Sequence, residues 1–209
     1  MTSVLLVAER DEQGEISQAT LQAVAAANGL TEAQVTIAIA GEAPSSAGSL
    51  AAEKVVTLSA IDASDSGIYE QATADVAAFA ASMNPDVVMF NKSDFGSIVG
   101  ARLAFRTDSA LAADCIGISN AGGAVSVTRP VYGGSALAEF EIRSTPAIVT
   151  LRAGAYEPST ETGSPSVEAA DSTVRVEQRA QVTDTVAEAR DGVRLEDANF
   201  VVSGGRGLG

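Results

Sequence analysis

Runs of apolar residues alternate with amphipathic segments along the first half of the chain. Four runs are rich in strand formers, which is typical of strands buried on both faces of a parallel sheet. These runs are Ser3 to Ala8, Val35 to Ala40, Lys54 to Leu58 and Asp86 to Phe90. The pattern therefore predicts four β-strands, of which the third is short.

Three segments between and after these runs carry apolar residues at the spacing of an α-helix. Ser17 is the expected N-cap of the first helix, which ends at Asn28-Gly29. Ser66 is the expected cap of the second helix, which ends at Asn84-Pro85, and Ser93 opens the third. Because strands and helices alternate with short links, we expect right-handed crossovers and a doubly wound parallel sheet.

The alternation of predicted strands and helices stops after Asp108, because no helical segment separates the apolar runs there. Leu111 to Ile118 predicts one more buried strand, which carries Cys115. Three further stretches predict an antiparallel β addition: Ala124 to Thr128, Ala136 to Ile142 and Ala147 to Leu151. The proline and double glycine of the segment from Arg129 to Gly134 predict a hairpin corner, which is either buried or a contact surface for a partner.

The rest of the chain predicts an excursion, a last strand and a connection. Residues 157–172 are rich in Ser, Thr, Glu, Pro and Gly and should be solvated, whereas residues 174–182 alternate like a strand with one wet face. We therefore divide the chain into a scaffold domain at 1–182, a charged linker at 183–198 and the start of a further domain at 199–209.

The segment at 199–209 carries the candidate cofactor site. Its three apolar residues, from Phe200 to Val202, predict a buried strand that opens into a glycine-rich turn. Gly205 and Gly207 would let the backbone approach an anion, and the guanidinium of Arg206 would pair with it. Since no strand or helix follows, we expect this to be the opening of a domain that the sequence does not contain.

Polar residues also follow the first and fourth predicted strands, at the carboxyl edge of the expected sheet, where such folds usually bind ligands. Asn91, Lys92, Ser93 and Asp94 would be one wall of a nucleotide site there. The other interpretation is a turn and a helix cap with solvated charges. We favour the second, because three of the four residues from Glu9 to Glu12 are acidic and the segment lacks the glycine fingerprint of dinucleotide folds.

The amino-acid composition limits the reactions and ligands that are possible for this chain. The chain has no histidine, which removes the commonest general base and metal ligand together with imidazole-dependent triads. Its 27 acidic and 13 basic residues give a net charge of −14, which disfavours nucleic acid and anionic lipid. No apolar stretch is long enough to span a membrane, so we expect a soluble, cytoplasmic protein without membrane insertion. The lone Cys115 should be buried.

Taken together, these segments resemble the α subunit of electron-transfer flavoproteins over essentially the whole chain. The most specific segment is Val201 to Leu208, the family's entry into its flavin domain. The other segments are Val4 to Glu9, Ser17 to Leu21, Arg129 to Gly134 and Thr150 to Tyr156. Departures occur at Gly134-Ser135 and Ala153, where relatives usually carry other residues, and they leave the details of the hairpin open.

The resemblance implies a fold and a function. The fold is α/β: a doubly wound, mostly parallel sheet of the Rossmann-like, adenine nucleotide α-hydrolase-like kind with an antiparallel β addition. The function is that of an electron carrier rather than an enzyme, with FAD as cofactor and a β subunit, dehydrogenases and an electron acceptor as partners. Gly205, Arg206 and Gly207 match residues that approach the flavin, and the family's other flavin-binding residues lie beyond Gly209. We therefore expect this chain alone to bind flavin weakly or not at all.

The alternative is a nucleotide-binding α/β domain of ATP-pyrophosphatase or stress-protein type. Ser203, Gly204 and Gly205 imitate the start of the pyrophosphatase loop. That loop, however, should follow the first strand, whereas this one lies at the far end and continues with Arg206.

Overall fold

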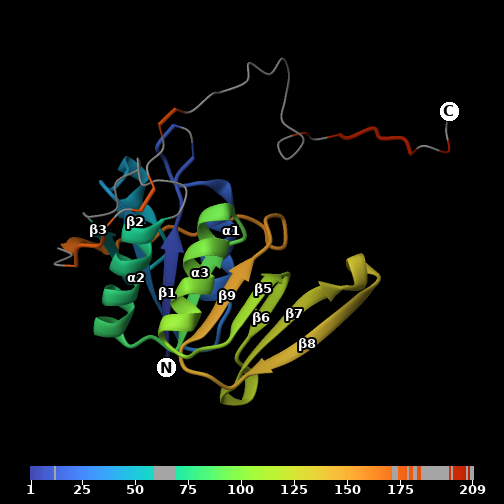
Figure 1. Ribbon diagram of the computed structural model, residues 1–209, viewed down its shortest axis with the longest axis horizontal. Coiled ribbons are helices and arrows are strands. Elements are labelled where there is room, and N and C mark those ends of the chain that lie inside the picture. Colours follow the sequence, from blue (N-terminus) through green and yellow to red (C-terminus); the bar gives the residue numbers. More distant parts are fainter. Residues whose placement is uncertain are drawn as a thin grey trace.

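The computed structural model contains two β-sheets and three α-helices in the residues that it describes (Figure 1). It describes residues 1–11, 13–58, 69–170, 174–177, 179–180, 183–184, 198, 200–205 and 207. The strands are β1 (Thr2–Ala8), β2 (Ala33–Ala40), β3 (Lys54–Leu58), β4 (Val87–Asn91), β5 (Leu111–Cys115), β6 (Gly117–Ser119), β7 (Val125–Val131), β8 (Ala136–Ile142), β9 (Ala147–Leu151) and β10 (Ser166–Ala170). The helices are α1 (Gln18–Asn28), α2 (Glu70–Met83) and α3 (Asp94–Arg106), with short 3-10 turns η1 (Ser45–Ser49), η2 (Ala121–Gly123) and η3 (Tyr132–Gly134).

The larger sheet has seven strands in the order β10-β3-β2-β1-β4-β9-β5. All of its neighbouring strands run parallel. The chain moves outward from β1 through β2 to β3 and then returns to place β4 on the other side of β1. The order therefore reverses between β1 and β4, which is the topological switch point where doubly wound sheets bind ligands.

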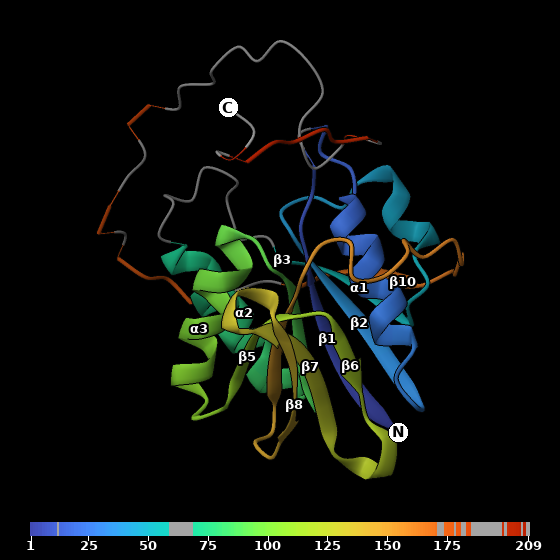
Figure 2. The same ribbon diagram turned by 90° about the vertical axis from the view of Figure 1, so that its right-hand side faces the viewer.

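Each face of this sheet is covered by its own layer. Alternate residues of β1 explain why: Val4 and Leu6 pack in the cluster that contains α1, whereas Leu5 and Val7 pack in the cluster that contains α2 and α3. Figures 1 and 2 show α2 and α3 on one face and α1 on the other. Because both faces are covered, the central strands are apolar throughout, as predicted for the four runs of the first half.

The helix boundaries largely follow the predicted caps. The Oγ atoms of Ser17 and Ser93 accept hydrogen bonds from the N–H groups of Thr20 and Gly96, which satisfies donors in the first turns of α1 and α3. Helix α2 begins at Glu70. Its predicted cap, Ser66, lies outside the described residues.

The smaller sheet, β6-β7-β8, is antiparallel and projects from the β5 side of the larger one (Figure 1). We call this sheet the arm. Val127 and Ile142 anchor the arm in the α1-side core. Tyr132, in the turn between β7 and β8, is 86 % exposed, so the predicted hairpin corner is not buried. The predicted antiparallel addition is thus present, with its corner in solvent.

Two predictions for this region were wrong. Residues 111–118 form two strands, not one, because the backbone of Asp114 adopts a φ of 61° and the register with β9 shifts between Ala112 and Cys115. The chain then crosses from the larger sheet into the arm. Ala147 to Leu151 is β9, a parallel strand between β4 and β5 in the larger sheet rather than part of the antiparallel addition. All five of its residues are buried, which is the property of a central parallel strand.

The later segments also differ from expectation. The solvated excursion of residues 157–172 contains β10, an edge strand beside β3 whose side chains are mostly exposed. Its polar composition reflects an edge in contact with water rather than the absence of a strand. Residues 174–177 form no strand, although 174–182 alternates in sequence. Cys115 is buried as predicted, and burial raises the pKa of its thiol to about 11.

Candidate functional site

The predicted cofactor residues are described only in part. A Cβ added at Gly205 or at Gly207 would have no atom within 4 Å, and both residues are exposed. Arg206 lies outside the described residues. The structure therefore leaves the role of Gly205, Arg206 and Gly207 as a prediction.

The apolar run that precedes these glycines forms no strand in the described residues. Phe200 is 94 % exposed and Val202 is fully exposed. An isolated apolar segment gains nothing from an extended conformation unless a neighbouring strand pairs with it. The prediction of a buried strand at this position is therefore wrong for this chain as the structure describes it.

The topological switch point is the best-built polar site in the described residues. It lies where β1 and β4 end side by side, so the predicted meeting of residues 8–10 with residues 91–93 is confirmed. Glu9 follows β1, and its Oε1 accepts a hydrogen bond of 2.7 Å from the Oγ of Ser93. The same Oγ accepts from the N–H of Gly96, so the Glu9 carboxylate reaches the first turn of α3 through Ser93.

A buried threonine fixes the backbone at this point. The Oγ1 of Thr20 accepts hydrogen bonds from the N–H of Glu9 and from the side-chain amide of Asn91, and it donates to the carbonyl of Glu9. Thr20 is fully buried and Asn91 nearly so. Helix α1 therefore locks the end of β1 to the end of β4.

Burial sets the charge behaviour of Glu9. Desolvation raises the pKa of its carboxyl, and hydrogen bonds from Ser93 and Asn91 oppose this rise only in part. A cavity of about 360 Å³ opens beside it, lined by Ala8, Glu9, Arg10, Asp11, Gly14, Ala40 and Phe95. In a nucleotide-binding sheet a phosphate would accept the donors at this helix end. Here the Oγ of Ser93 accepts the N–H of Gly96 and donates to the Glu9 carboxylate, so a carboxylate already lies at this helix end, and the geometry disfavours a phosphate and supports the interpretation as a turn and a helix cap.

A second polar group lies farther along the same edge. Arg152 after β9 donates to both carboxylate oxygens of Asp114, from Nε at 2.9 Å and from Nη2 at 2.5 Å. These bonds hold the pKa of the Asp114 carboxyl below its usual range, with smaller contributions from the charges of Lys92 and Arg129. The N–H of Asp114 donates to Thr150 Oγ1, which stabilises its unusual backbone. The pair ties β5 to β9 at the bulge.

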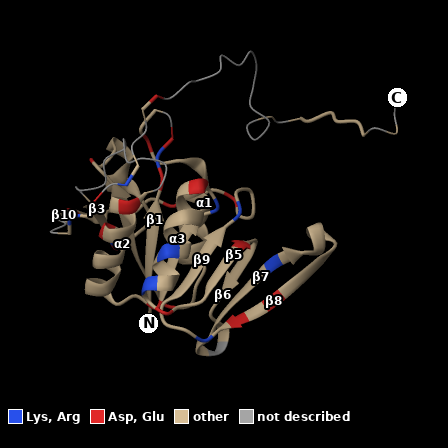
Figure 3. Ribbon diagram, in the orientation of Figure 1, with Lys and Arg blue, Asp and Glu red and all other residues tan. Residues whose placement is uncertain are grey.

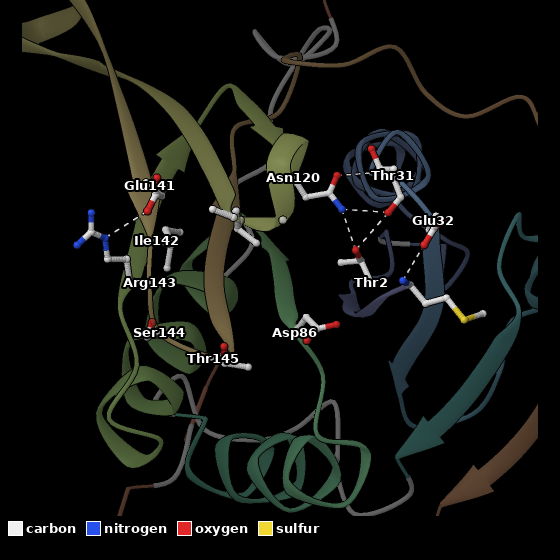
Figure 4. Close-up of a pocket in the computed structure, with 14 residues that line it drawn as sticks. Thr2, Thr31, Glu32, Asp86, Asn120, Glu141, Ile142, Arg143, Ser144 and Thr145 are labelled. Atoms are coloured by element: carbon white, nitrogen blue, oxygen red, sulfur yellow. Dashed lines mark hydrogen bonds and ion pairs between the residues drawn. The ribbon is translucent and has the colours of Figure 1, made fainter.

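Sequence reasoning missed a third site, at the opposite edge of the sheet. A cavity of about 580 Å³ lies there between the amino end of β1 and the base of the arm (Figure 4). Asn120 donates to the Oγ1 of Thr2 and to the carbonyl of Thr31, and its Oδ1 accepts from the N–H of Thr31. Asp86 accepts from the N–H of Ser3. These bonds span up to 118 residues, so no local signal marked them.

The chemistry available to these sites is limited. Among the residues that the structure describes, no group of three or more Cys, Asp and Glu side chains could hold a metal ion. Acidic and basic residues are distributed over both layers and the arm rather than gathered in one field (Figure 3). No helix in the described part of the chain is long and apolar enough to cross a bilayer. The polar groups of the switch point and the arm base mainly hold strands together.

Comparison with known proteins gives a consistent result. A family model described as the electron transfer flavoprotein domain matches residues 4–177. This range contains all three helices and the arm, and nearly all of the larger sheet.

Curated relatives match over part of the chain. Electron transfer flavoprotein subunit alpha of Bacillus subtilis is 35 % identical over 128 residues, which is 60 % of this chain and 39 % of the relative. The subunit alpha of Thermoanaerobacterium thermosaccharolyticum is 30 % identical over 130 residues, again 60 % and 39 %. Protein FixB of Escherichia coli is 30 % identical over 128 residues, which is 59 % of this chain and 40 % of that protein. The matched region thus spans about two fifths of these relatives.

Proposed function

The chain belongs to the electron transfer flavoprotein domain family, and on that premise we propose that it is the scaffold domain of the α subunit of an electron-transfer flavoprotein. In this proposal the whole protein takes electrons from dehydrogenases, holds them on FAD and passes them to an acceptor in the cytoplasm. It is a carrier and not a catalyst of covalent chemistry. The scaffold supplies shape and partner contacts, and the flavin is held elsewhere.

The family match over residues 4–177 is the observation that carries the proposal. The carboxyl edge of the sheet supports the assignment of a scaffold role. A domain that used its own nucleotide would need free donors at the switch point, whereas Ser93 and Asn91 are engaged with Glu9 and Thr20. These engaged donors weigh against the alternative of a pyrophosphatase-type or stress-type nucleotide domain.

The flavin contacts fall to the glycine-rich segment. Gly205 and Gly207 leave room for a close backbone approach, and Arg206 supplies a cation that either pairs with the pyrophosphate or stabilises an anionic reduced flavin. Charge-assisted hydrogen bonds of this kind contribute about 1.5–3 kcal/mol each. Because Gly204, Gly205 and Gly207 are exposed in this chain, other parts of the whole protein would have to enclose the cofactor.

The arm is the surface that we assign to the β subunit. It exposes 86 % of Tyr132 at its turn, 62 % of Leu137 and 47 % of Phe140. Leu137 and Phe140 lie three positions apart on β8 and so point to opposite faces of the arm. Exposed apolar residues of this size mark an interaction site, and their arrangement favours a partner that packs on both faces.

The test of the proposed function uses the whole reading frame that encodes this chain, co-expressed with a β subunit. We expect a yellow complex with one flavin per α subunit, and Arg206→Ala should lower flavin affinity about tenfold or more. Arg143→Ala is the matched control, because that arginine is exposed on the arm side and pairs only with Glu141 among the described residues. A colourless complex, or ATP or AMP binding by the chain alone, would contradict the proposal.

The arm is tested separately in the same complex. Leu137→Ser combined with Phe140→Ser should weaken β-subunit binding at least tenfold, since each buried apolar side chain contributes about 1.5–3 kcal/mol. Phe105→Ser is the control, because Phe105 is 89 % exposed on α3, away from the arm. Equal effects from the arm variant and the α3 variant would remove the arm as the interface.

A further inference from the structure

The side-chain amide of Gln71 ties residues after β10 to the first turn of α2. Gln71 is 7 % exposed, and its Nε2 donates to the carbonyl of Val174 at 2.9 Å. Its Oε1 accepts from the N–H of Val176 at 3.2 Å. A carbonyl at one residue and an N–H two residues later are the groups that a neighbouring strand would pair. The Gln71 side chain therefore makes the two hydrogen bonds that the backbone of a neighbouring strand would make.

A buried carboxylate fixes the orientation of that amide. Asp75 lies one helical turn after Gln71 and is 1 % exposed, and its Oδ1 accepts from Gln71 Nε2 at 2.9 Å. Because a carboxylate only accepts hydrogen bonds, the NH2 end of the amide must face Asp75 and Val174, which turns the oxygen toward Val176. The other oxygen, Oδ2, is buried without a hydrogen-bond partner in the described residues. A buried acceptor left in this state is costly, so the site is not optimised for stability alone.

A second tie lies beside the first. The Oε2 of Glu70 accepts from the N–H of Arg179 at 2.9 Å. Two consecutive residues of α2 thus bind the backbone at three points between Val174 and Arg179. We call residues 174–179 the strap, of which residue 178 lies outside the described residues.

Polar ties rather than apolar burial hold the strap. Val174 and Val176 are only partly buried, and Arg175, Glu177 and Arg179 are exposed. A cavity of about 690 Å³ separates the strap from α3 and is lined by Glu70, Ala101, Arg102, Phe105, Arg106, Val176, Glu177 and Arg179. Since a cavity lies between the strap and α3, the bonds from α2 contribute to the position of the strap.

We propose that Gln71 is a positioning residue that fixes where the chain leaves the scaffold. With the Gln71 amide in place, the end of the strap has one position beside α2. Without the amide, that position changes and varies from molecule to molecule. The proposal rests on the proposed function only in that the residues after the strap include the glycine-rich segment at 203–207. The tie itself needs neither flavin nor a partner.

Hydrogen exchange on the full chain gives the first test. Gln71→Leu combined with Asp75→Leu removes the Gln71 tie without leaving a buried carboxylate unpaired, and the amide of Val176 should then exchange at least tenfold faster, with a smaller increase at Arg179, which keeps its bond to Glu70. Gln22→Leu is the matched control, because its Oε1 accepts from the N–H of Gly154 in a different loop. Unchanged exchange at Val176 and Arg179 in the double variant would overturn the proposal. So would acceleration spread evenly over the sheet.

A distance measurement separates positioning from simple support. Spin labels at Ser82→Cys on α2 and Asp184→Cys after the strap, in a Cys115→Ala background, report this position directly because both parent side chains are exposed. The distance distribution should broaden in the Gln71→Leu, Asp75→Leu variant and stay narrow with Gln22→Leu. An unchanged distribution would refute a positioning role. No flavin or β subunit is present, so failure here is distinguishable from failure of the proposed function.

Discussion

The larger sheet and the arm are built from the same strand-forming residues but bury them to opposite extents. All five residues of β4 and of β9 are buried. In β8, five of seven residues are exposed. The larger sheet has a layer on each face, whereas the arm is anchored at Val127 and Ile142, with Ile118 and Val125 packed partly against the core, and most of β8 is exposed. Buried apolar residues stabilise the fold, whereas exposed apolar residues are available to bind a partner.

Two phenylalanines test this comparison most strongly. Phe90 on β4 is fully buried, and Phe140 on β8 is 47 % exposed. Phe90→Ala should lower the free energy of unfolding by about 3–5 kcal/mol, because it removes packing and leaves a cavity. Phe140→Ala should cost less than about 1 kcal/mol in the chain alone. Urea unfolding of both variants measures the difference. Similar losses would mean that the arm contributes to the core as the larger sheet does.

A glycine tests how closely the helical layer approaches the sheet. A Cβ at Gly96 in α3 would overlap the backbone carbonyl of Asn91. Backbone cannot move aside as a flexible side chain can, so Gly96→Ala should cost about 3 kcal/mol. Gly48→Ala is the control, since a Cβ there has nothing within 4 Å, and its change should be near zero. Thermal unfolding of the pair measures this. A tolerated Gly96→Ala would show that α3 is not pressed onto β4.

The joint between the two regions comes next in size. Asn120 is 9 % exposed and makes three hydrogen bonds to Thr2 and Thr31, which hold the base of the arm to the larger sheet (Figure 4). Asn120→Ala should cost about 2 kcal/mol, because the N–H of Thr31 loses its acceptor and the carbonyl of Thr31 keeps only the hydroxyl of Thr2 as a donor. Asn28→Ala removes one exposed bond to Ala51 and should cost under about 1 kcal/mol. Equal losses in urea unfolding would argue against a joint at Asn120.

The sequence predicted the buried part of the fold better than its edges. Continuous apolar runs identified β1 to β4, and the serine caps located the starts of α1 and α3. The run of β9 carried the same signal, yet it was assigned to the arm because the arm interrupts the alternation of strands and helices. The polar strand β10 carried no apolar signal, since an edge strand in contact with water needs none.

The candidate sites show the same division. The meeting of Glu9 with Ser93 could be predicted, because parallel strands end at the same edge of a sheet. The bond between Gln71 and Val174 spans 103 residues, and that between Asn120 and Thr31 spans 89, so only the folded chain brings these groups together. The cofactor residues around Arg206 stay a prediction, since sequence alone supports them.

The smallest expected effect concerns the polar edge where the larger sheet meets water. Burial raises the pKa of the Glu9 carboxyl in the folded chain, so the folded state holds its proton to higher pH than the unfolded chain does. Stability contributed by this group is therefore complete below the ordinary carboxyl pKa and is lost as the pH rises through the folded-state pKa.

The variant Glu9→Gln keeps an acceptor for Ser93 but carries no charge. It should therefore unfold at a slightly higher urea concentration than the parent at pH 7 and at nearly the same urea concentration at pH 4. Asp11→Asn is the control, because that carboxylate is exposed in the same loop. If Glu9→Gln instead lowers the midpoint at pH 7, the charged carboxylate stabilises the switch point, and its hydrogen bonds there outweigh the cost of its burial.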